Sequence, residues 1–103
     1  MPRKLYDIAV ARSGDKGSAA NIGVIARDPA NYPLLQLHVT ADRVEAFFRP
    51  MDVGKVVRYE LPNLGALNFI LPDILQGGGS VNLRIDAQGK ALGQALLEME
   101  IEG

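Results

Sequence analysis

Alternating apolar and polar positions near the N-terminus predict a β-hairpin. Apolar side chains alternate with polar or small ones in residues 5–10 and again in residues 21–26, which is the period of a strand with one buried face. The segment between the two runs is charged and rich in small residues. We expect residues 13–18 to turn the chain sharply, because Gly14 and Gly17 can adopt a positive φ without a Cβ clash.

Signals for the start of a helix follow the hairpin. Asp28 is followed by a proline, the usual order of an N-cap residue and a first helical position. Pro33 would remove a helical hydrogen bond, so the helix either starts again at Asn31 or stays irregular until about Leu34. Thr40 is a second N-cap candidate. The helix after it has an apolar stripe at helical spacing, formed by Val44, Phe47, Phe48 and Met51.

The middle of the chain predicts one more strand and one more helix. Residues 55–61 alternate again, and we expect Arg58 and Glu60 to pair on one face of this strand. Residues 64–75 are apolar without a clean period. Because several of their leucine and isoleucine residues fit one helical face, we predict a helix there, closed by the glycines at 77–79.

The C-terminal segment, residues 83–102, has two interpretations. Asp86 either caps a helix that includes residues 91–96, or it begins the turn of a hairpin. The spacing of Ala91, Leu92, Ala95 and Leu96 favours the helix. Apolar and glutamate residues then alternate to the end, which predicts a final strand with one acidic, solvated face.

Together these elements predict an α+β sandwich with a mostly antiparallel sheet and helices on one face. The chain has 103 residues, so we expect a single domain over residues 1–103. Hydrophobic residues make up 48% and charged residues 22% of the chain, as in an ordinary globular domain. The formal charge of -1 provides no attraction to nucleic acid or anionic lipid, and we predict neither as a partner.

The composition also argues against several chemistries. The sequence has no cysteine and one histidine, so we expect no disulfide, no thiolate nucleophile, no metal site and no cofactor. His38 lies in an apolar stretch, where a packed or surface role is the simpler interpretation. The N-terminus lacks the apolar core of a secretion signal, and no run approaches the length of a membrane span. We therefore predict a cytoplasmic protein.

The polar segment at residues 11–18 contains the strongest candidate for a binding site. It combines a carboxylate, cations, hydroxyl groups and backbone amides, which suits a phosphate, a carboxylate or an amide-bearing ligand. In the alternative, Asp15 caps the amides of the turn and pairs with Lys16, so that the turn satisfies itself. The candidate ligand-binding residues are Ser13, Gly14, Asp15, Lys16, Gly17, Asn21 and Asn68.

No complete catalytic or nucleotide-binding motif supports this candidate. The patterns G-x-x-x-x-G-K-[ST] and G-x-G-x-x-G are not met, so nucleoside triphosphates and dinucleotides are not indicated. Ser13 and Lys16 have the S-x-x-K spacing of serine acyl-enzymes, but the partner motifs are missing and the glycines disfavour an aligning helix. Asn68 lies in an apolar block, where it is either a hydrogen-bonded core amide or a ligand contact.

Three blocks of the sequence resemble a known family. They are ARSGDKGSAANIGV at residues 11–24, RYELPNLGALNFIL at residues 58–71 and LRIDAQGKALGQALLEMEIE at residues 83–102. In these blocks, which span most of its length, the chain resembles the small ferredoxin-fold domain found at the C-terminus of acyclic terpene utilisation proteins. The resemblance implies a ferredoxin-like, two-layer α+β fold.

The resemblance also implies a role in the bacterial breakdown of branched acyclic terpenes such as citronellol and geraniol, through acyl-CoA thioesters and a biotin-dependent carboxylase. In that family the small domain usually follows a much larger one. We therefore expect a non-catalytic accessory or assembly domain that acts with a larger terpene-utilisation-type partner. The alternative is a stand-alone small enzyme or ligand-binding protein that takes an acyl-CoA or a carboxylate at the Ser13–Lys16 loop. In either case an edge strand such as the C-terminal one is able to pair with a second copy, which would give a homo-oligomer.

Overall fold

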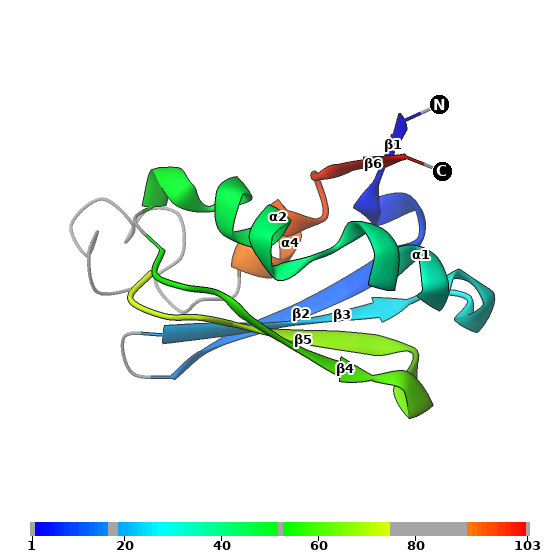
Figure 1. Ribbon diagram of the computed structural model, residues 1–103, viewed down its shortest axis with the longest axis horizontal. Helices are drawn as coiled ribbons and strands as arrows, with labels where there is room; N and C mark the ends of the chain where they lie inside the picture. The colour runs from blue at the N-terminus through cyan, green and yellow to red at the C-terminus, as the bar shows by residue number, and fades with distance from the viewer. Residues whose placement is uncertain (1, 17–18, 52, 75–90, 103) are drawn as a thin grey trace.

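Two layers make up the fold, as expected for an α+β sandwich with helices on one face (Figure 1). The computed structural model describes residues 2–16, 19–51, 53–74 and 91–102. One layer is an antiparallel sheet of β2 (Ala9–Lys16), β3 (Ala19–Ala26), β4 (Val57–Leu61) and β5 (Ala66–Leu71). The other layer contains α1 (Tyr32–His38), α2 (Ala41–Phe47) and α4 (Ala91–Leu96). A separate ribbon pairs β1 (Pro2–Lys4) with β6 (Glu100–Glu102), close to both chain ends.

The sheet has the strand order β2-β3-β5-β4, with every neighbouring pair antiparallel. Strands β3 and β4 are therefore parallel to each other, with β5 between them. The chain connects them through α1 and α2 on one face, and this split β-α-β unit is typical of ferredoxin-like folds. The second face of the sheet has no described helix over it, and we call it the open face (Figure 1).

The hairpin predicted near the N-terminus is present, but its boundaries differ from the prediction. Residues Leu5–Asp7 form a 3-10 turn, because the Asp7 carboxylate accepts a hydrogen bond from the Lys4 amide at 3.1 Å. Strand β2 then pairs one-to-one with β3 as far as Lys16 opposite Ala19. Residues 13–16 are thus strand and not turn, because their backbones pair in register with β3. Gly14 has no positive φ, since among the described residues only Gly65 and Asp73 do.

Both predicted helix starts are confirmed. The Asp28 carboxylate accepts a hydrogen bond from the Ala30 amide at the start of a short 3-10 turn, Pro29–Asn31, and α1 follows with Asn31 as its N-cap residue. The Thr40 hydroxyl caps α2 by accepting a hydrogen bond from the Arg43 amide at 3.1 Å.

The helix predicted over residues 64–75 is wrong, because this segment contains strand β5. The turn Pro62–Leu64 and the left-handed conformation of Gly65, at φ 61°, join β4 to β5 as a hairpin. Strand β5 is central, with apolar residues on both faces, and this hides the alternation of a strand. At the C-terminal end the helix interpretation is confirmed by α4. Asp86 and the glycines at 77–79 lie outside the described residues.

The hydrophobic core lies between the two layers. Its largest fully buried side chains include Phe69 from β5, Ile22 from β3 and Leu35 from α1. Phe48, directly after α2, is also buried and packs edge-to-face against Phe47, with ring centroids 5.1 Å apart. In the part of the chain that the structure describes, no helix is long and apolar enough to cross a membrane.

Candidate ligand-binding face of the sheet

Strand β2 separates the predicted site residues between its two faces. Ser13 lies on the helix-covered face, where its Oγ accepts a hydrogen bond from the Gly93 amide of α4 at 3.0 Å. A Cβ on Gly93 would lie only 3.1 Å from that Oγ, so the helix and the strand are in close contact here. Ser13 therefore holds α4 on the sheet. Residues three apart in a strand do not share a face, so the S-x-x-K spacing does not provide the geometry of a serine acyl-enzyme.

The open face brings Asn21 and Asn68 together. Their strands are neighbours, and Asn21 Nδ2 donates to Asn68 Oδ1 at 3.5 Å. Gly14 lies opposite Asn21 on β2, and Gly23 lies opposite Asn68 on β3. The two asparagines, 47 residues apart in the sequence, thus form an amide pair between two glycine positions. The structure thus places them next to each other, while their binding role stays a prediction.

Three other predicted residues lie at the end of the hairpin. The strand register places Asp15 opposite Ala20 and Lys16 opposite Ala19, whereas Gly17 lies outside the described residues. The anion-binding turn proposed for this segment therefore stays a prediction.

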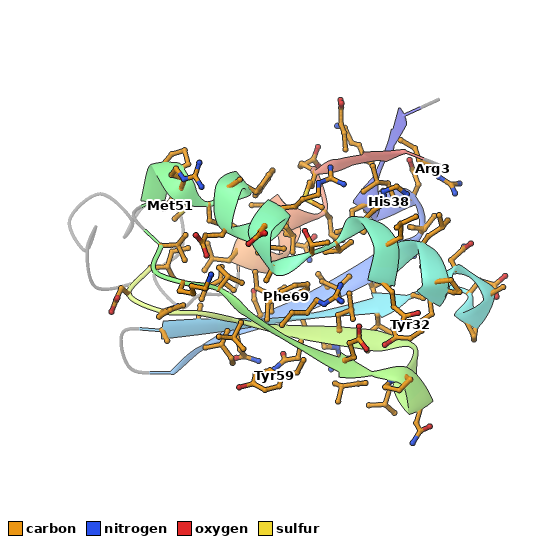
Figure 2. The ribbon with its side chains drawn as sticks, in the orientation of Figure 1. Arg3, Tyr32, His38, Met51, Tyr59 and Phe69 are labelled. Atoms are coloured by element: carbon orange, nitrogen blue, oxygen red, sulfur yellow. The ribbon has the colours of Figure 1, made fainter. Side chains whose placement is uncertain are left out.

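A row of residues in register crosses the open face through all four strands. Arg12 on β2 is opposite Gly23 on β3, Gly23 is opposite Asn68 on β5, and Asn68 is opposite Tyr59 on β4. Tyr59 points away from the helices, in contrast to Phe69 on the neighbouring strand (Figure 2). Arg12 is exposed, and no described residue forms a hydrogen bond or an ion pair with its guanidinium. The row thus ends in a cation on one side and an aromatic ring on the other.

The sequence did not single out Arg12 or Tyr59 as site residues. Arg12 is two positions before Gly14, so it shares a face with Gly14 only if residues 12–14 are extended. We had expected a turn beginning at Ser13, and in a turn residues two apart do not have to share a face. The alternation of residues 55–61 did place Tyr59 on one face of a strand, but it could not show which face the helices cover.

On the edge strand β4, the apolar face is the open one. Val57, Tyr59 and Leu61 are 42%, 54% and 39% exposed, and we call these three residues the β4 strip. Arg58 instead faces the helices. Its guanidinium donates to the carbonyl of Val39 at 3.1 Å and to the Glu60 carboxylate at 2.8 Å, so the predicted pair with Glu60 is confirmed.

Two charged side chains away from the open face, Lys4 and Glu98, pair with each other. Lys4 Nζ lies 2.6 Å from Glu98 Oε1, and this hydrogen bond and charge raise the pKa of Lys4 above its ordinary value of 10.5. His38 ends α1, and its carbonyl oxygen accepts a hydrogen bond from Arg43 at 2.9 Å. Within residues 2–16, 19–51, 53–74 and 91–102, no group of three histidine, aspartate or glutamate side chains is arranged to hold a metal ion.

Comparison with known proteins identifies the family. No curated protein and no solved structure matches the chain. The family model of the AtuA ferredoxin-like domain matches residues 3–102, which is nearly the whole sequence. This agrees with the split β-α-β unit and with the resemblance carried by the three sequence blocks. The chain belongs to the AtuA ferredoxin-like domain family.

Proposed function

We propose that this chain is a small, non-catalytic assembly domain that docks through the β4 strip onto a larger protein of the acyclic terpene utilisation type. The observation that carries the proposal is the exposure of the strip: Val57, Tyr59 and Leu61 stand side by side on a sheet face that no described helix covers. The partner is a protein with a complementary apolar surface. Family membership supports this choice, because the small domain usually accompanies a much larger one.

The strip provides a useful part of a docking energy. Complete burial of a valine, leucine or phenylalanine-sized side chain contributes about 1.5–3 kcal/mol. The three residues of the strip are already about half covered by the sheet, so a partner would gain about 1 kcal/mol from each. Apolar residues in neighbouring positions of one strand also present a continuous surface, which single scattered leucines do not.

The position of the strip favours a protein partner as well. Strand β4 is at the edge of the sheet, so the partner can approach both the open face and the side of the molecule. Leu64, in the turn that follows β4, is 69% exposed, so a further apolar side chain is accessible beyond the end of the strand.

Isothermal titration of the purified larger protein with this chain tests the proposal. The informative variant is Val57→Lys, which places a charge in the strip, and the matched control is Leu37→Lys, at a 68%-exposed leucine on α1. We expect Val57→Lys to weaken binding by about tenfold or more, since a charge left in an apolar contact costs over 1.4 kcal/mol. Leu37→Lys should bind like the original chain.

Two results would contradict the proposal. One is the absence of binding between the chain and the larger protein. The other is equal affinity of the two lysine variants, which would place the contact away from the strip. Circular dichroism of both variants establishes that they are folded before the titration.

A further inference from the structure

The other half of the open face, on β2, β3 and β5, carries a polar cluster that the docking proposal does not use. We infer that this cluster binds a small carboxylate with a short hydrocarbon part, with Gly23 as the floor of the site. The inference goes beyond the assembly role and does not depend on it, because its residues and its test belong to this chain alone.

Gly23 leaves an open position in the middle of the face. A Cβ on Gly23 would meet only the backbone oxygen of Arg12, at 3.9 Å, so a methyl-sized group fits at this position without a clash. Arg12 and Asn68 flank this position on the neighbouring strands. Strands in a sheet are about 4.8 Å apart, so the two flanking residues are separated by about 10 Å at the backbone. Their side chains can both reach a small group placed over the glycine.

The flanking side chains are hydrogen-bond donors suited to a carboxylate. Arg12 offers a guanidinium with no partner among the described residues, and a guanidinium can donate two parallel hydrogen bonds to one carboxylate. Asn68 uses its Oδ1 to accept from Asn21, which leaves its Nδ2 group as a donor. The Arg12 guanidinium provides the positive charge that a carboxylate over Gly23 would need.

The next row along the sheet is apolar and suits the hydrocarbon part of such a ligand. Outside the β4 strip it consists of Val10, Ile25 and Ala66, which are in register from β2 to β5. Ile25 is two residues from Gly23 on the same strand and on the same face. A carboxylate over Gly23 would therefore have its hydrocarbon part beside Ile25, and this contact would remove apolar surface of both the ligand and the protein from water.

Titration of the ¹⁵N-labelled chain with sodium 3-methylbutanoate, followed by NMR at constant pH and ionic strength, tests the inference. We expect saturable shifts of the amides around Arg12, Gly23 and Asn68. Arg12→Gln should weaken the apparent affinity by about tenfold, the usual size of a lost charge-assisted hydrogen bond. The matched control is Arg49→Gln, at an exposed arginine beside α2, and it should leave the affinity unchanged.

A second variant keeps the test independent of charge. Gly23→Ala adds a methyl group where nothing lies within 3.9 Å, so the strand should keep its fold while the floor of the site is filled. We expect a weaker affinity of about the same size as for Arg12→Gln, with the amide shifts of the distant helices unaltered.

Three outcomes would overturn the inference. They are shifts scattered over the molecule, unchanged affinity in both Arg12→Gln and Gly23→Ala, and equal affinity for inorganic phosphate or for the neutral 3-methylbutanol. Val57→Lys should retain carboxylate binding, so a failed docking proposal and a failed ligand site give different results.

Discussion

The contact between Gly93 of α4 and strand β2 makes a direct stability prediction. In Gly93→Ala the new methyl carbon would lie 3.1 Å from Ser13 Oγ and 3.3 Å from the Ala11 Cβ. The Ala11 Cβ is fixed by the backbone of a paired strand, and Ser13 Oγ can rotate away only by giving up its hydrogen bond to the Gly93 amide. The variant would also disturb the 3.0 Å hydrogen bond from the Gly93 amide to Ser13 Oγ.

The size of the effect follows from opposing contributions. Alanine is favoured over glycine in a helix by about 1 kcal/mol. Overpacking of a tight contact costs about 1–3 kcal/mol, and weakening of the hydrogen bond costs about 1 kcal/mol more. We expect Gly93→Ala to lower the free energy of unfolding by about 1–3 kcal/mol. For a domain of this size, each kcal/mol corresponds to about 4–8 °C in Tm.

Urea and thermal unfolding monitored by circular dichroism measure this loss. Gly14→Ala is the matched control, because its Cβ would make only an ordinary 3.5 Å contact with Asn21 Oδ1, and we expect its stability to change by less than about 0.5 kcal/mol. In the double variant Ser13→Ala/Gly93→Ala the closest contact is removed, so its loss should be smaller than the sum of the single losses. A Gly93→Ala chain as stable as the original would refute the packing argument.

Three further predictions concern contacts outside the open face. Arg58→Met should lower the unfolding free energy by about 2 kcal/mol, because it removes charged hydrogen bonds to the end of α1; a urea midpoint equal to that of the original chain would count against this role. Thr40→Ala should cost about 1 kcal/mol through loss of the α2 cap, measured in the same way, and a neutral result would show that the cap is dispensable. Glu98 raises the pKa of Lys4 above 10.5, so the stabilisation is complete below that pH and is lost as the pH rises through the folded-state pKa. Urea unfolding from neutral to strongly alkaline pH should show this loss in the original chain and not in Lys4→Met, and parallel curves would contradict it.

The sequence predicted much of the helical layer correctly. Asp28 and Thr40 are local capping signals, and their hydrogen bonds form within three residues of each side chain. The α4 helix was recognised from apolar spacing alone. Such features depend on neighbours in the sequence, so they can be predicted without knowledge of the tertiary structure.

The errors came from features that depend on partners distant in the sequence. Strand β5 is central, and apolar residues on both faces removed the alternation that identifies a strand. Gly14 was assigned to a turn, although pairing with β3 keeps it extended. The division of Ser13 and Asn21 between opposite faces followed from the same pairing, and it could not be seen before the register was known.

The most direct test of the account is hydroxyl-radical footprinting of the chain with and without the larger terpene-utilisation protein. Tyr59 in the β4 strip and Tyr6 in the N-terminal 3-10 turn are almost equally exposed, at 54% and 55%, so Tyr6 is an internal control for Tyr59. We predict that the complex protects Tyr59 from oxidation and leaves Tyr6 unchanged. Equal oxidation of Tyr59 in the free chain and in a saturated complex would contradict docking through the open face.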